Sequence, residues 1–159
     1  MEPVWTLATG LPRNDTGRTK LAEAASPITE QPGDDLGIAD IDLQHRFFAS
    51  LINRLAADLR QVTDAALRAS LLQELSAYAR FHFISEENLM ARAGYPALAE
   101  HRALHNRLID ELSARQTRLR LCLAPQDVDD AITFLVQWFK GHTQHDDRTF
   151  AQYLQPAAG

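Results

Sequence analysis

Two pairs of metal-ligating side chains, close together in the sequence, constrain the fold of this chain most. His82 is paired with Glu86, and His101 is paired with His105. Each pair is spaced four residues apart, so on an α-helix the two side chains lie about 40° apart on one face. The segment AGYP at 93–96 lies between the pairs and is typical of a helix end followed by a helix start. A hairpin that reverses there would bring both pairs together between facing helices, as in metal sites inside helix bundles.

The composition predicts a single globular domain in the cytoplasm. The chain has 159 residues, of which 45% are hydrophobic and 23% charged, which is ordinary for a soluble protein. The net charge of -5 and the scattered Lys and Arg argue against nucleic acid or an anionic membrane as a partner. The first residues lack the pattern of a signal peptide, and no apolar run approaches the ~18 residues of a membrane span. The single cysteine, Cys122, excludes an internal disulfide and is expected to be a small core residue.

The first part of the chain differs in pattern from the rest. Residues 1–36 have no sustained hydrophobic period and are interrupted by prolines and glycines, which predicts an irregular N-terminal arm, partly ordered at best. Within this arm, residues 17–25 could form one short helix, and Trp5 is a candidate to dock on the domain. Residues 37–156 are expected to form the folded domain.

Apolar residues recur at alternating steps of three and four through four segments of that domain, which predicts four amphipathic helices. No strand-like alternation competes with them. The predicted fold class is therefore all-α. Because the expected connections are short, consecutive helices should be antiparallel neighbours, which predicts an up-down-up-down four-helix bundle. The expected helices begin at Ala39, at Thr63 or Asp64, at Pro96 and at 125–127, and the second and fourth end near Gly94 and Leu154.

Five of the six histidines fall on the inward faces of these helices. A lone core histidine is usually a structural residue, but five at similar depth, with a carboxylate, need a common partner because an unpaired buried polar group costs several kcal/mol. A metal centre supplies that partner. The five are His45, His82, His101, His105 and His142.

The fourth helix offers two adjacent carboxylates, Asp146 and Asp147. A spacing of four residues favours Asp146 as the neighbour of His142. The apolar face of the helix, however, resumes at Phe150, three residues after Asp147. The two halves of that face join only if five residues separate His142 from its next inward partner, which a π-bulge would allow. We therefore predict that Asp147 is the ligand and that Asp146 faces solvent, with His145 exposed or behind the ligands.

These motifs resemble those of hemerythrin, and more closely the bacterial single-domain hemerythrins. The resemblance covers about residues 36–154 and keeps the ligand-bearing stretches in order. The chain differs from the family pattern before the first histidine, because Ser26–Asp35 contains no tryptophan where bacterial members tend to carry one. The matching stretches are IDLQH at 41–45, HFISEE at 82–87, HRALH at 101–105 and WFKGHTQHDD at 138–147.

The resemblance implies a non-haem di-iron centre with a bridging hydroxide or oxide. Three histidines would hold one iron and two histidines the other, two carboxylates would bridge them, and the five-coordinate iron would keep one position open for O2. The residues so implied are His101, His105 and His142 for one iron, His45 and His82 for the other, and Glu86 and Asp147 as bridges.

Ligand type favours O2 binding over oxidation, because neutral imidazoles stabilise high-valent iron less than the carboxylates of di-iron oxidases do. Phe48, Phe83 and Trp138 are expected to line an apolar O2 pocket or simply to belong to the core. Gln44 and Glu87 could accept hydrogen bonds from the outer ring nitrogens of the histidines. The leading interpretation is a reversible O2 carrier, store or sensor and not an enzyme. The alternatives are a di-iron enzyme that handles O2, peroxide or nitric oxide, a regulatory module that senses iron or O2, and, least favoured, a structural zinc site.

Overall fold

The computed structural model describes residues 28–122 and 124–155. The short helix expected within residues 17–25 and the docking of Trp5 lie outside the described residues.

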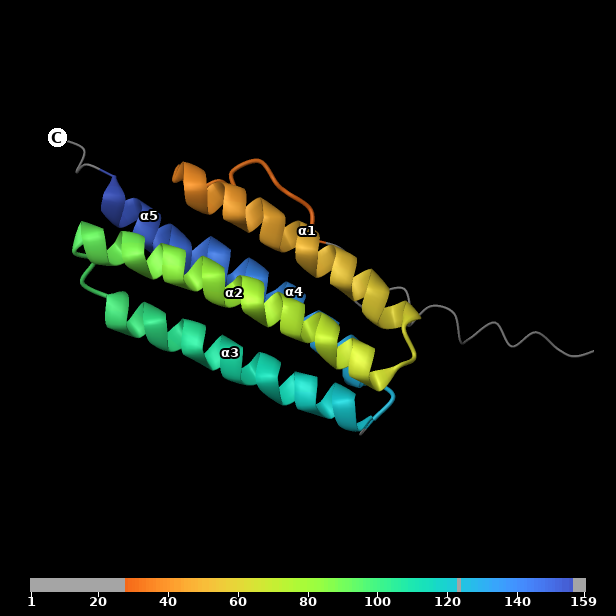
Figure 1. The fold of residues 1–159 in the computed structure, drawn as a ribbon. Coiled ribbons are helices and arrows are strands. Elements are labelled where there is room, and N and C mark those ends of the chain that lie inside the picture. Colours follow the sequence, from red (N-terminus) through yellow and green to blue (C-terminus); the bar gives the residue numbers. More distant parts are fainter. Residues whose placement is uncertain (1–27, 123, 156–159) are drawn as a thin grey trace, which may run out of the picture.

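The described residues form four helices in an up-down-up-down bundle, which confirms the expected all-α fold class (Figure 1). The fourth helix is one continuous rod of three parts, with a π-helical segment, η1, in its middle. Neighbouring helices pack in a ring, so that α1 and α3 each contact both α2 and α4. The bounds are α1 (Ala39–Gln61), α2 (Ala65–Ala93), α3 (Leu98–Leu121), α4 (Asp127–Gly141), η1 (His142–Asp147) and α5 (Arg148–Leu154).

The ends of α2 follow the expected signals. The carboxylate of Asp64 accepts a hydrogen bond from the backbone N–H of Leu67 at 2.6 Å, so Asp64 is the N-cap. Gly94 ends the helix in the left-handed region at φ 65°, and the N–H of Tyr95 donates to the carbonyl of Met90 at 3.0 Å. The chain therefore reverses at Gly94, but α3 begins only at Leu98, after a short turn, and not at Pro96 as predicted.

The turn between α3 and α4 is held by the buried carboxylate of Asp127. This group accepts hydrogen bonds from the Arg118 guanidinium at 2.7 and 2.9 Å and from the N–H of Ala124 at 2.9 Å. Cys122 lies just before this turn, past the last residue of α3, and is exposed. The prediction that Cys122 is a core residue is wrong, because the chain leaves the packed face of α3 there.

The described part of the arm is fixed along α1. The buried carboxylate of Asp42 accepts hydrogen bonds from the backbone N–H groups of Leu36 at 2.7 Å and Gly37 at 3.0 Å, which turns the chain into the helix. Farther back, the Asn53 amide bonds both the N–H and the carbonyl of Ile28, each at 2.8 Å. Between these two contacts, the guanidinium of Arg46 on α1 donates to both carboxylate oxygens of Asp35 at 2.8 Å. The arm from Ile28 onward is therefore tied to α1 at three points.

Buried apolar side chains form a large cluster in one half of the bundle and a small one, with Leu36, Ile41 and Ala151, at the other end. Near the end of α2, Met90 is fully buried, whereas Leu89 is only partly buried and packs against the small cluster. Leu154 ends the fourth helix, as expected, and is 38% exposed because it lies in the last helical turn. Among the described helices, none is long and apolar enough to span a membrane.

Candidate metal centre

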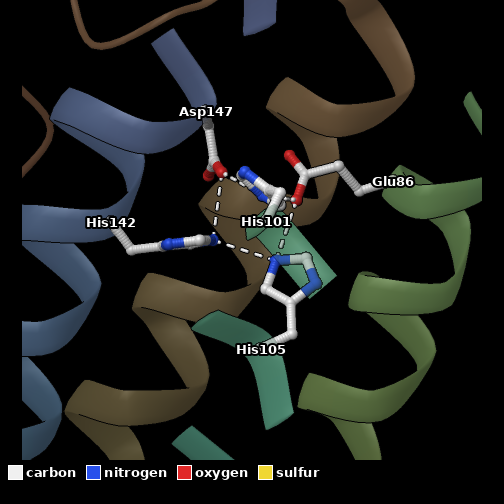
Figure 2. A group of neighbouring side chains, drawn as sticks. All are labelled: Glu86, His101, His105, His142 and Asp147. Atoms are coloured by element: carbon white, nitrogen blue, oxygen red, sulfur yellow. Dashed lines mark hydrogen bonds and ion pairs between the residues drawn. The ribbon is translucent and has the colours of Figure 1, made fainter. Parts of the chain in front are cut away.

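All seven predicted metal ligands converge between the two apolar clusters. Each of the four helices contributes at least one of them, and none is more than 8% exposed. Five are drawn in Figure 2, where imidazoles from α3 and η1 and carboxylates from α2 and η1 point toward one another. The seven are His45, His82, Glu86, His101, His105, His142 and Asp147.

The donor atoms are close together. The Nε2 atoms of His105 and His142 are 3.0 Å apart, and Nε2 of His142 is 3.0 Å from Oδ1 of Asp147. Nε2 of His101 lies 3.2 Å from Oε2 of Glu86. Nitrogen ligands about 2.1 Å from a metal lie roughly 3.0 Å apart when their bonds to it are perpendicular. The spacing therefore suits side chains arranged around a common ion.

The donors fall into two overlapping groups, in each of which all donor atoms lie within 4.8 Å of one another. One group contains three histidines and the other contains two, and the same two carboxylates belong to both. Such an arrangement could hold two ions with the carboxylates between them. The three-histidine group is His101, His105, His142, Glu86 and Asp147, and the two-histidine group is His45, His82, Glu86 and Asp147.

The register of the fourth helix is as predicted. The π-helical segment η1 runs from His142 to Asp147, so residues five apart come to lie on one face. The side chain of Asp147 is fully buried among the histidines, whereas that of Asp146 is 39% exposed.

Several buried polar atoms in the cluster lack a hydrogen-bond partner in the described residues. They include Oε1 of Glu86, both carboxylate oxygens of Asp147 and Nε2 of His45. Nε2 of His45 and Oδ2 of Asp147 are only 3.2 Å apart, but they are not in hydrogen-bonding geometry. Unpaired buried polar atoms are costly, and here all of them face one another. Their lone pairs fit a bound cation.

Burial and the two carboxylates move the imidazole pKa values in opposite directions. Burial lowers the pKa of His82 to about 4, because it disfavours the charged ring more than Glu86 stabilises it. Burial also acts on His101 and His142, but Asp147 and Glu86 outweigh it, raising the pKa of His101 to about 9 and that of His142 to about 10. In the metal-free protein, the latter two rings therefore carry protons in place of a cation.

Three of the histidines meet acceptors at their outer ring nitrogens. Nδ1 of His82 is 2.9 Å from the Gln44 amide oxygen, and Nδ1 of His105 is 2.9 Å from a Glu87 carboxylate oxygen. Both acceptors were candidates from the sequence.

The third acceptor is Asp146, with a carboxylate oxygen 3.1 Å from Nδ1 of His142. The sequence-based interpretation, which placed this carboxylate in solvent, missed its contact. The spacing of four from His142 to Asp146 was a signal for it. His145 is exposed, as predicted, and its ring bonds the carbonyl of Gly141 at 2.9 Å.

Aromatic rings surround the ligands. Phe83 stacks on the His105 ring at 3.8 Å between centroids, and Trp138 stacks on the His142 ring at 4.8 Å. Phe48 lies 5.8 Å from the His82 ring. The three predicted aromatic residues thus contact the centre. A fourth, Phe139, lies 6.1 Å from His45 and was not singled out from the sequence.

A cavity of about 440 Å³ borders the centre on the side of His45. The arm, α1, α4 and η1 form its walls, with several polar side chains, among them those of Arg46, Thr143 and Gln144. His45 is also the most exposed of the seven ligands, at 8%. The centre therefore approaches solvent at its two-histidine end.

Comparison with known proteins agrees with this geometry. The family model of the hemerythrin HHE cation-binding domain matches residues 36–154. The chain is 36% identical over 125 residues to a bacteriohemerythrin of Pseudomonas aeruginosa, covering 77% of this chain and 79% of the relative. It is 33% identical over 122 residues to one of Stenotrophomonas maltophilia, covering 76% and 77% of the two chains.

A crystal structure of wild-type hemerythrin has the same fold, with a TM-score of 0.71 and 23% identity over 82% of this chain and 100% of the other. These similarities agree with the expectation of a binding protein and not an enzyme. On the matched family model and the curated relatives, this chain belongs to the hemerythrin family.

Proposed function

We propose that this protein holds a pair of iron ions at the seven-residue centre and binds O2 reversibly there. The observation that carries the proposal is the pair of overlapping donor groups that share Glu86 and Asp147. His101, His105 and His142 would hold one iron, and His45 and His82 the other. The iron pair would supply the two electrons that bind O2. O2 is accordingly the proposed ligand, and the protein is proposed to serve as a carrier, store or sensor.

The ligand set supports iron in preference to other metals. Imidazole and carboxylate together suit iron, and a site with no thiolate does not favour the soft metals. Two ferrous ions, two bridging carboxylates and one hydroxide leave a formal charge of one plus, which a buried site tolerates better than a larger charge. A structural zinc site is disfavoured, because such sites usually take four ligands in a closed tetrahedron.

The surrounding aromatic rings support binding without further reaction. Phe48, Phe83 and Trp138 contact three of the ligand imidazoles and bring no strongly acidic group to them. They exclude water from that side of the centre and so limit the supply of protons. Slow proton delivery favours release of O2 over its conversion to free peroxide.

The partly polar cavity beside His45 is the observation in favour of the alternative, a di-iron enzyme that handles O2, peroxide or nitric oxide. Water admitted there could deliver protons to the two-histidine end.

The cytoplasmic location and the division into an arm (1–36) and a bundle (37–156) remain predictions, as does a sensing role.

Optical spectroscopy tests the proposal. Protein loaded with ferrous iron under argon should develop a visible charge-transfer band on exposure to O2, and the band should disappear when O2 is removed. The exposed histidine provides a matched control, since His145→Gln should preserve the reversible band. Irreversible oxidation to the diferric state in the first cycle would contradict reversible binding and favour the enzyme. Iron analysis of the loaded protein should give two ions per chain.

A further inference from the structure

The two halves of the centre differ in what supports their histidines from behind. In the three-histidine group, the outer nitrogens of His105 and His142 face the carboxylates of Glu87 and Asp146. In the two-histidine group, the outer nitrogen of His82 faces a neutral amide. Among the described residues, the outer nitrogen of His45 has no hydrogen-bond partner, and neither has that of His101. Charged acceptors are thus confined to one half.

The charged acceptor on His105 is itself held in place. The second oxygen of Glu87 accepts a hydrogen bond from Nε of Arg102 at 2.8 Å, and the Glu87 side chain is only 15% exposed. The acceptor on His82 has no such charged support: the phenol of Tyr78 donates to the backbone carbonyl of Gln44 at 3.0 Å, and the side-chain amide oxygen of Gln44 faces the His82 imidazole.

An imidazole that donates its outer N–H to a carboxylate is a more basic and better-oriented ligand than one that donates to an amide. We propose that the carboxylates of Glu87 and Asp146 make the three-histidine half the tight metal site, which fills first, and that the amide of Gln44 keeps the two-histidine half weak and exchangeable. Glu87, Asp146 and Gln44 are positioning residues, since they act through the ligands. The proposal rests on the proposed function, because it requires two ions.

The accessibility of the two halves agrees with this order. His101, His105 and His142 are at most 4% exposed and His82 is 1% exposed, whereas His45, in the two-histidine half, is 8% exposed and borders the cavity beneath the arm. An ion in the two-histidine half therefore has the shorter path to solvent.

The ligand count alone also favours the three-histidine half, so the test must change the outer acceptors and leave the ligands intact. The full-length metal-free protein is titrated anaerobically with Co²⁺, whose visible absorption reports its coordination, in competition with a chromophoric chelator. The unaltered protein should bind two ions in steps at least about tenfold apart in affinity. Glu87→Gln should weaken the first step about 10- to 100-fold, the range typical for loss of such a partner.

Gln44 provides the decisive pair of variants. Gln44→Glu should strengthen the second step about tenfold and leave the first unchanged, whereas Gln44→Ala should weaken the second step. A gain in affinity cannot arise from damage to the fold, so the two directions together separate positioning from stability. Glu111→Gln, which removes an exposed carboxylate of α3 that pairs with Arg115, should change neither step.

Two failures are distinguishable. Binding of a single Co²⁺ would overturn the proposed two-metal function and the inference with it. Two steps that Gln44→Glu leaves unchanged, or shifts together, would overturn the inference alone.

Discussion

Metal binding at this centre should release about two protons at pH 8. The structure raises the pKa of His101 to about 9 and that of His142 to about 10, because the buried carboxylates stabilise the charged rings more than burial disfavours them. At pH 8 the His101 ring is therefore about nine-tenths protonated, and the His142 ring is almost fully protonated. A metal ion needs both as neutral ligands, so it must displace both protons.

Three other groups at the centre add little to this number. His82, with a pKa near 4, is already neutral, and the lowered pKa values of Glu86 and Asp147 keep both carboxylates ionised. A third proton would be released if a water between the ions loses one. Since a raised pKa means that protons compete with the metal below that pKa, the apparent affinity should rise with pH. A release of two protons corresponds to about a hundredfold gain per pH unit below pH 8.

Isothermal titration calorimetry with Co²⁺ in two buffers of different ionisation enthalpy measures the released protons directly. Competition titrations at pH 6.5, 7.25 and 8 measure the slope. His145→Gln, which removes an exposed imidazole outside the cluster, should leave both quantities unchanged. Release of fewer than one proton at pH 8, together with a flat pH dependence, would refute the charge state assigned to His101 and His142.

Three further predictions test the site and the core. Asp147→Asn should reduce bound metal from two ions to one, by metal analysis after gel filtration, whereas Asp146→Asn should retain two. Co²⁺ at a free concentration 100 times its dissociation constant should raise the free energy of unfolding by about 2.7 kcal/mol in urea titrations, and a chelator should reverse the gain. Met90→Ala should lower the free energy of unfolding by about 2–5 kcal/mol, since this side chain is fully buried. Leu89→Ala, at a partly buried position, should cost less than half as much in the same assay.

The fourth helix illustrates how far local pattern reaches. The break in its apolar face between His142 and Phe150 predicted a five-residue step, and the structure has the π-helical segment that produces it. The prediction of this step is confirmed because the burial of Phe150 and the inward position of Asp147 require the same rotation of the chain.

The acceptors behind the histidines illustrate where local pattern ends. Gln44 lies on α1 but contacts His82 on α2, 38 residues away, and Glu87 contacts His105 across the hairpin. Spacing along one helix does not specify how far a neighbouring helix is rotated or shifted along its axis. The sequence therefore offered these two residues as candidates without assigning either to a histidine.

The sequence by itself determined the helices, the seven inward candidate ligands and the register at η1, because each depends on periodicity within one helix. The resemblance to the hemerythrin family had already implied which donors share a group. Only the tertiary structure decided which half has charged acceptors and that a cavity reaches His45. It also placed Cys122 in solvent. Those features depend on the relative placement of separate helices and of the arm, which arises from packing and not from the pattern of any one segment.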